Sequence, residues 1–301
     1  MSLLQLVYLL PLVGLWVFVG LSEPLTMVAI ASTLFLAIKT HSLLIYRERQ
    51  LRSSSKFRLD FASCLGWYTL WWGLKPSEFF NREPRQPIER SELIFALLKT
   101  AIGVLLLTLL VPRILSHWSA SGYRDVVGGW LGMVGIVFCM HFGYSHLTAV
   151  ILRATGRPVT PIMNCPIMAA SVSEFWGKRW NLAFRDYAHV TLFMPLARQW
   201  GVAIGSMAGF AFSGVIHELA ISLPARGGYG WPMLYFFIQG GGVLSERWFA
   251  KWGWWNTGSI ANRIWAIAVV ALPVPLLFHH AFVGKVIVPI IRWWDLSWLL
   301  A

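Results

Sequence analysis

The 301-residue chain is 57% apolar and only 13% charged, and its mean hydropathy is +0.61. A soluble domain of this length needs more charge to cover its surface, so the composition excludes an ordinary soluble protein and indicates contact with lipid. The formal net charge of +12 does not indicate nucleic acid. The basic residues lie in short loops between apolar runs, where anionic lipid headgroups account for most of them and a phosphorylated substrate for others.

Seven apolar runs are long enough to cross about 30 Å of hydrocarbon. They cover residues 3–21, 25–46, 93–112, 126–152, 201–223, 231–249 and 262–283. The first run lacks a basic leading segment and a clear cleavage site, so we expect a retained helix rather than a removed signal peptide. Two Trp-rich stretches, 61–75 and 285–300, are interrupted by Pro, Gly or charge and are expected to be interfacial or re-entrant.

These runs predict one all-α membrane domain over residues 1–301. It would have about seven to eight transmembrane helices, with interfacial or re-entrant helices around a central cavity. With the N-terminus in the cytosol, eighteen Lys and Arg fall in cytosolic loops and five in the opposite loops. The excess of basic residues on one side favours this orientation and places loops 47–92 and 153–200 together on the cytosolic side.

The first candidate site is the segment 173–185. Wound as one helix, it has a polar, cationic side and an aromatic side. The polar side holds Glu174, Lys178, Asn181 and Arg185, and the aromatic side holds Trp176, Trp180 and Phe184. We expect an interfacial helix whose cationic face points at a polar cavity. The alternatives are an ordinary membrane-surface helix and, for Asn181, a buried amide that satisfies backbone groups.

The second candidate site lies in the run 201–223. Gly201, Gly205 and Gly209 repeat every fourth residue, which lets another helix approach closely, and the ridge continues to Ser213 and His217. His217 and Glu218 are costly inside an apolar span and therefore indicate a functional site. A core histidine that bonds to a neighbouring helix is equally open. Glu218 points about 100° away from its neighbour on a helix, so it is expected to line a tunnel or to pair with a basic residue.

No metal site is expected. Cys64, Cys139 and Cys165 lack metal-binding spacing, and the His that would complete a zinc protease motif after His217-Glu218 is absent. Gly240-Gly241-Gly242 is expected to mark close helix packing or a local break in a helix.

The two candidate sites together resemble the membrane-bound O-acyltransferase superfamily, and most closely its wax synthase-like branch. The resemblance rests on Phe175-Trp-Gly-Lys-Arg-Trp-Asn181, followed after about 36 residues by Ser213-Gly-Val-Ile-His-Glu218. It extends over roughly residues 160–295. Lys178 stands where the family commonly has Arg, which keeps the charge but not the guanidinium geometry.

The resemblance implies transfer of an acyl group from acyl-CoA to the hydroxyl of an alcohol or lipid, with no cofactor beyond the co-substrate. His217 would be catalytic and Asn181 essential. Chemistry agrees, since a neutral imidazole can take the proton of an attacking hydroxyl and a buried amide can donate to the oxyanion. The expected substrate-binding residues are Trp176, Lys178, Arg179, Trp180, Arg185, Ser213 and Glu218.

A second class of protein fits the same residues. A transporter or flippase could relay protons through an intramembrane His and Glu. The absence of a visible inverted repeat counts against it. The expected setting is a multi-pass position among membrane lipids, in either a bacterial inner membrane or the endoplasmic reticulum.

Overall fold

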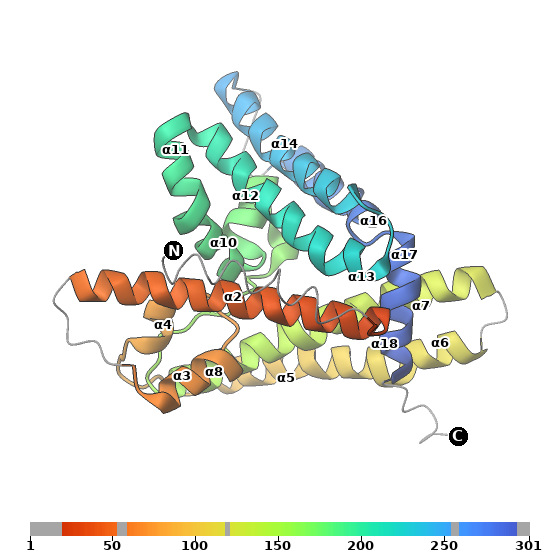
Figure 1. Cartoon of the computed structure of the whole chain (residues 1–301), viewed down its shortest axis with the longest axis horizontal. Coiled ribbons are helices and arrows are strands. Elements are labelled where there is room, and N and C mark those ends of the chain that lie inside the picture. Colours follow the sequence, from red (N-terminus) through yellow and green to blue (C-terminus); the bar gives the residue numbers. More distant parts are fainter. Residues whose placement is uncertain (1–19, 53–58, 118–120, 254–258, 294–301) are drawn as a thin grey trace. The chain divides into compact units, whose positions relative to one another are not determined.

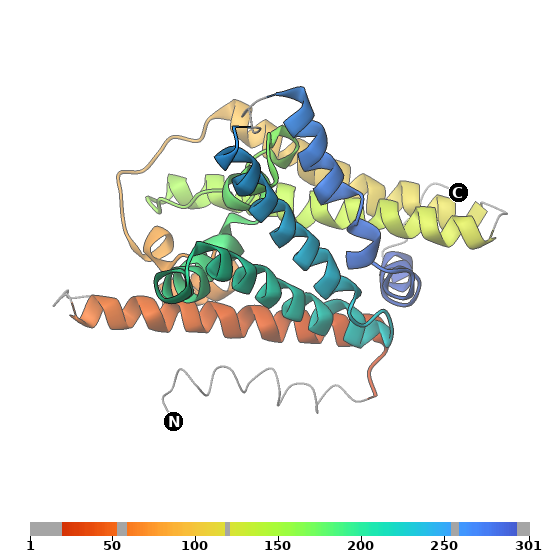
Figure 2. The same cartoon turned by 90° about the horizontal axis from the view of Figure 1, so that it is seen from above.

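The computed structural model describes residues 20–52, 59–117, 121–253 and 259–293, and these ranges contain helices and no strand (Figures 1 and 2). The predicted all-α class is confirmed. The chain divides into two compact units. The first takes the described residues up to Ile162 and those from Ile287 onward, and the second takes Met163–Val286.

The first unit is built on long helices. Its elements are α2 (Glu23–Arg52), α3 (Phe61–Thr69), α4 (Pro76–Phe80), α5 (Arg90–Leu105), α6 (Val111–His117), α7 (Ser121–Ile136), α8 (Ser145–Ala154) and α18 (Val288–Trp293). A π-helical turn joins α5 to α6, and another joins α7 to α8. Gly103 lets these two rods meet, because a Cβ there would lie 2.3 Å from the backbone nitrogen of Cys139.

The Trp-rich stretch 61–75 is interrupted, as predicted. Helix α3 ends at Thr69, and irregular backbone follows before α4. Lys39 of α2 is fully buried, and its Nζ donates to the carbonyls of Trp71 at 2.6 Å and Gly73 at 2.9 Å. Ser42, one turn later, donates to the carbonyl of Leu74 at 2.5 Å. The side chains of α2 thus satisfy backbone groups that no helix satisfies.

The second unit holds both candidate sites. Its elements are α9 (Val172–Glu174), α10 (Leu182–Ala188), α11 (Met194–Trp200), α12 (Val202–His217), α13 (Leu223–Ala225), α14 (Trp231–Lys251), α15 (Ile260–Ala271), α16 (Val274–Leu277) and α17 (His280–Phe282). Helices α12 and α14 run side by side (Figure 1). They approach closely because a Cβ at Gly240 would lie 2.5 Å from Met207 Sδ. Gly240-Gly241-Gly242 therefore marks close packing, and α14 continues through it without a break.

Five helical segments among the described residues are long and apolar enough to cross a membrane. They are Glu23–Arg52, Arg90–Ser116, Tyr123–Ala154, Val202–Ala225 and Ile260–Leu277, which coincide with five of the predicted runs. The run 3–21 lies outside the described residues, and the stretch 285–300 is described only to Trp293. The run 231–249 is helical within α14 but is not among the five, and it carries Gln239, Glu246 and Arg247. The predicted count of seven to eight spans is not confirmed.

Candidate active site

The segment 173–185 is not one continuous helix, so that prediction is wrong. Helix α9 ends at Glu174, and a π-helical turn occupies Phe175–Arg179. Trp180 is then extended, with ψ 128°, and Asn181 adopts the left-handed conformation, with φ 41° and ψ 60°. Asparagine adopts that conformation more readily than most residues and also favours helix starts, which explains why the chain breaks at Asn181.

Asn181 caps α10. Its Oδ1 accepts a hydrogen bond from the backbone N–H of Phe184 at 3.2 Å, and its own backbone N–H points at Met163 Sδ at 3.3 Å. The side-chain oxygen of Asn181 thus satisfies a backbone group, as the alternative prediction for this residue stated. The side-chain NH2 group takes no part in the cap and keeps two hydrogens for another acceptor.

Arg179 fastens the turn. Its Nη2 lies 2.7 Å from Glu174 Oε1, and its Nη1 donates to the carbonyl oxygens of Asn164 at 3.4 Å and Cys165 at 3.3 Å. The backbone N–H of Ala170, which donates to the Glu174 carboxylate at 2.8 Å, and the Arg179 guanidinium hold the pKa of Glu174 below its usual value. This arrangement gives Arg179 a structural role in the turn, whether or not it also contacts a substrate.

The other two cations among the predicted substrate-binding residues are more accessible than Arg179. Lys178 is exposed, and Arg185 is exposed with its Nε 3.0 Å from Asp186 Oδ1. The break at Asn181 separates these two cations, so they do not share the single helical face that the sequence predicted. Trp180 turns away from them and stacks on Phe175 with ring centres 5.5 Å apart.

His217 lies at the end of α12 with one ring nitrogen already engaged. Its Nδ1 is 2.7 Å from the carbonyl oxygen of Ser213. A carbonyl only accepts hydrogen bonds, so Nδ1 carries the hydrogen and Nε2 keeps a lone pair. Ser213 is buried, and its own hydroxyl donates to the carbonyl of Gly209 at 3.0 Å. Ser213 therefore serves His217 through its backbone rather than through its side chain.

An aromatic bridge connects the two sequence motifs. The His217 ring lies 4.6 Å from the ring of Phe236 on α14, and the Trp176 ring lies 5.8 Å from the same phenyl ring. The Trp176 indole N–H donates to Gln239 Oε1 at 3.1 Å. Gln239 is fully buried and donates to the carbonyl of Val269 at 2.8 Å. The structure thus brings Trp176 and His217 into contact with the same phenylalanine.

Asn181 and His217 are not placed in contact by any hydrogen bond among the described residues. Their helices meet nearby through Phe184 and Phe212, which stack with ring centres 5.7 Å apart. Phe184 lies one turn after Asn181, and Phe212 lies just before Ser213. The two predicted catalytic residues therefore belong to packed helices of one unit, without a direct bond between them.

Two carboxylates in this unit hold helix starts. Glu218 Oε1 accepts from the backbone N–H groups of Gly230 at 2.9 Å and Met233 at 3.2 Å, at the start of α14. Buried Glu246 accepts from the N–H groups of Val172 at 2.5 Å and Ser173 at 2.9 Å, at the start of α9. The Glu218 bonds go to backbone amides and not to a basic residue, which was one of the two expectations; the other, that Glu218 lines a tunnel, stays a prediction.

Sequence reasoning missed Gln239, Phe236 and Glu246. A signal for two of them was available, because Gln239 and Glu246 are polar residues within the apolar run 231–249 and such residues commonly bond to a neighbouring segment. Phe236 gives no such signal, since nothing in an apolar run distinguishes the phenylalanine that meets the histidine.

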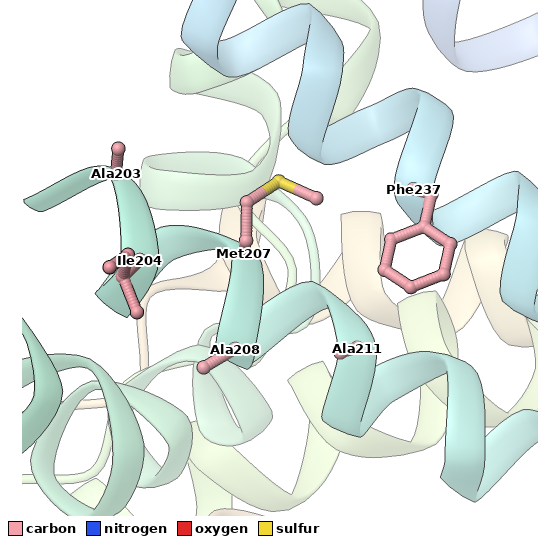
Figure 3. Close-up of a pocket in the computed structure, with 6 residues that line it drawn as sticks. All are labelled: Ala203, Ile204, Met207, Ala208, Ala211 and Phe237. Atoms are coloured by element: carbon pink, nitrogen blue, oxygen red, sulfur yellow. The ribbon is translucent and has the colours of Figure 1, made fainter.

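Only some of the glycines predicted to form a packing ridge lie in close contact with another segment. A Cβ at Gly205 would lie 2.8 Å from the Phe193 carbonyl oxygen, whereas at Gly209 it would meet nothing within 4 Å. An apolar groove of about 370 Å³ lies on the first half of α12 (Figure 3). It is lined by Ala203, Ile204, Met207, Ala208, Ala211 and Phe237. His217 is not part of this lining, so the cavity expected to reach it remains a prediction.

Comparison with known proteins agrees with this site. Residues 159–239, which contain both motifs, match the sequence model of the membrane bound O-acyl transferase family. The segment that builds the site thus resembles the membrane-bound O-acyltransferase family, and together with the apolar helices it indicates an integral membrane protein.

Named relatives narrow the resemblance. Over 123 residues the chain is 32% identical to a long-chain-alcohol O-fatty-acyltransferase of Simmondsia chinensis, covering 36% of this chain and 35% of that protein. It is 27% identical over 150 residues to probable long-chain-alcohol O-fatty-acyltransferase 9 of Arabidopsis thaliana, covering 46% and 44%. An acyl-CoA–sterol O-acyltransferase of the same plant is 26% identical over 115 residues, covering 36% and 33%. The predicted resemblance to the wax synthase-like branch is confirmed, and each match spans less than half of the relative's length.

Proposed function

We propose that this protein transfers an acyl group from acyl-CoA to the hydroxyl of a hydrophobic alcohol or lipid and forms an ester. The observation that carries the proposal is His217, whose Nδ1–H is held by the Ser213 carbonyl so that Nε2 is the basic nitrogen. It lies within residues 159–239, which match an acyltransferase family, and the chain has relatives named for O-acyl transfer.

In the proposed reaction, Nε2 of His217 removes the proton of the acceptor hydroxyl as its oxygen attacks the thioester carbonyl carbon. A hydroxyl is a weak nucleophile at neutral pH, so this proton transfer is needed for attack. The tetrahedral intermediate then expels the thiolate of CoA as the carbon–sulfur bond breaks. The imidazolium returns the proton to that thiolate, which leaves an ester, free CoA and a neutral His217.

Asn181 is proposed as the donor to the oxyanion or as a support for His217. The cap at Phe184 uses only its side-chain oxygen, so the NH2 group keeps the hydrogens that this role needs. The left-handed backbone of Asn181 supports a fixed orientation of that group, because the cap and the chain break both restrict its side chain.

Lys178 and Arg185 are proposed to bind the phosphates of CoA, since both side chains are exposed. Trp176, Trp180 and Ser213 would then shape the site, Trp176 through its contact with Phe236. To bind the phosphates of cytosolic acyl-CoA, loop 153–200 must face the cytosol, as the distribution of basic residues predicts.

We also propose a cytosolic N-terminus and about seven to eight spans, in a bacterial inner membrane or the endoplasmic reticulum. Cysteines introduced at Ser54 and Thr155 should be labelled by an impermeant reagent from the same side of sealed vesicles. Labelling from opposite sides would contradict this topology.

The test of the activity uses purified protein in detergent, with acyl-CoA and a long-chain alcohol but no membrane gradient. The proposal expects release of free CoA that depends on the alcohol, together with formation of the ester. A proton-coupled transporter would release no CoA under these conditions. The comparisons lend that alternative no support, since the relatives reported above are named as acyltransferases.

A further inference from the structure

The mechanism above does not use Glu218, although this carboxylate directly follows the proposed base. Its Oε1 accepts two backbone N–H groups at the start of α14, while its Oε2 is buried and has no hydrogen-bond partner among the described residues. Glu218 thus lies at the positive end of the α14 dipole, beside two backbone N–H groups. A buried carboxylate oxygen without a donor is costly and therefore calls for a functional explanation.

Glu218 and His217 both contact the first turns of α14. The carboxylate binds the N–H of Met233, and the imidazole lies over the ring of Phe236, three residues later. Residues three apart on a helix are neighbours on its surface, so the two side chains meet α14 within one turn of each other. Gly214 makes this possible, since a Cβ there would lie 2.6 Å from Met233 Sδ and 3.1 Å from Met233 Cα.

The backbone changes its winding at the same point. Helix α12 ends at His217, and a π-helical turn begins at Glu218 and runs to Ser222. Such turns are rare and are often found at functional sites, because the wider winding redirects side chains. Here adjacent residues that an α-helix would splay apart both contact the first turns of α14.

We propose that Glu218 is a positioning residue that acts electrostatically through His217, by stabilising the imidazolium formed during acyl transfer. This inference rests on the proposed function. When Nε2 takes the hydroxyl proton, the ring gains a positive charge in an apolar surrounding, and the Glu218 carboxylate supplies the opposing negative charge. Glu218 neither accepts the proton nor forms a covalent bond. The imidazolium passes the proton to the thiolate of CoA. Attraction between charges is stronger where protein excludes water, and the Oε2 atom of Glu218 is buried.

Glu246 supplies a matched comparison. It is also a carboxylate at a helix start in this unit, and its side chain is buried, but both of its oxygens accept hydrogen bonds, from Val172 and from the N–H and hydroxyl of Ser173. Its contacts account for it fully as a structural group. Glu218, with one oxygen unpaired, is not accounted for in that way.

The test replaces Glu218 by glutamine, which removes the charge but keeps an oxygen that can accept from Gly230 and Met233. We expect kcat to fall ~10–100-fold, because the charge acts only once the imidazolium forms. The KM values for acyl-CoA and alcohol should stay within about twofold, since binding is unaffected. Glu246→Gln should leave kcat per folded molecule unchanged. Melting temperature is measured for each variant.

These variants distinguish failure of the inference from failure of the proposed function. Turnover of Glu218→Gln within about twofold of wild type would overturn it, and so would a raised KM for the alcohol with kcat retained. If Glu218→Gln is less stable than wild type, Glu218→Asp restores the charge: recovery of kcat supports the inference, and continued loss overturns it. Inactive His217→Ala beside fully active Glu218→Gln rejects only the role of Glu218, whereas active His217→Ala rejects the proposed function itself.

Discussion

Replacement of Asn181 separates the helix cap that the structure shows from the role in catalysis that we propose. The oxygen of Asn181 caps α10 through Phe184, its backbone is left-handed, and its NH2 group is proposed to serve the oxyanion. Asn181→Asp keeps a capping oxygen and a residue type that tolerates this backbone, but it removes both side-chain hydrogens. Asn181→Ala removes the cap and also puts a Cβ-bearing residue of poor left-handed propensity at φ 41°.

The two variants should therefore differ in stability. Loss of the cap costs about 1 kcal/mol, and alanine in the left-handed region costs roughly another 1–2 kcal/mol. Asn181→Ala should be destabilised by about 2–3 kcal/mol, whereas Asn181→Asp should stay close to wild type. Thermal unfolding in detergent, followed by circular dichroism, measures this difference.

The two variants should differ little in activity, although they differ in stability. Loss of one oxyanion donor costs about 10²–10³-fold in turnover, so both variants should lose that much per folded molecule. The assay is alcohol-dependent release of CoA by purified protein. Asn181→Asp with normal stability and nearly normal turnover would refute the oxyanion role and leave Asn181 as a helix cap alone.

Three further predictions follow from the site. His217→Ala should lower ester formation by about 10²–10⁴-fold without loss of folded protein. The control His189→Ala, at an exposed histidine of the same unit, should not lower ester formation. A fall of less than about tenfold in His217→Ala would contradict its role as the base. Lys178→Gln with Arg185→Gln should raise KM for acyl-CoA more than KM for the alcohol, and equal effects would argue against a phosphate site. Because the pKa of Glu174 is lowered in the folded protein, the ionised carboxylate stabilises the fold at pH values above its ordinary pKa of 4.5. This stability is lost as pH falls through the lowered pKa. The melting temperature of wild type should therefore exceed that of Glu174→Gln at pH 7 and converge with it in acid.

Hydropathy was sufficient to predict most of the fold. Length and apolar character identify α2, α12 and α15 because the energy of burying an apolar stretch in lipid depends on composition alone. Helix α14 was also predicted as a helix, but its polar residues lower its hydropathy below that of the membrane-crossing candidates, and one of them, Gln239, bonds to Trp176 in the second unit.

The site was predicted less completely. The residue types at Asn181 and His217 indicated chemistry, yet helical periodicity over 173–185 gave a wrong geometry. A periodic pattern carries no information about a single left-handed residue, whose conformation depends on the cap it forms. The bridge from Trp176 through Phe236 to His217 depends on how helices pack, which no local pattern encodes.

Buried Lys39 has a consequence for the order of biogenesis. A lysine near the middle of a lone inserted helix costs about 2.5–3.5 kcal/mol on insertion scales. Its compensating partners, the carbonyls of Trp71 and Gly73, are translated more than thirty residues later. Helix α2 should therefore insert stably in the bilayer only after segment 61–75 has emerged from the ribosome. The two segments would then insert together, as one cooperative hairpin, rather than one after the other as independent helices.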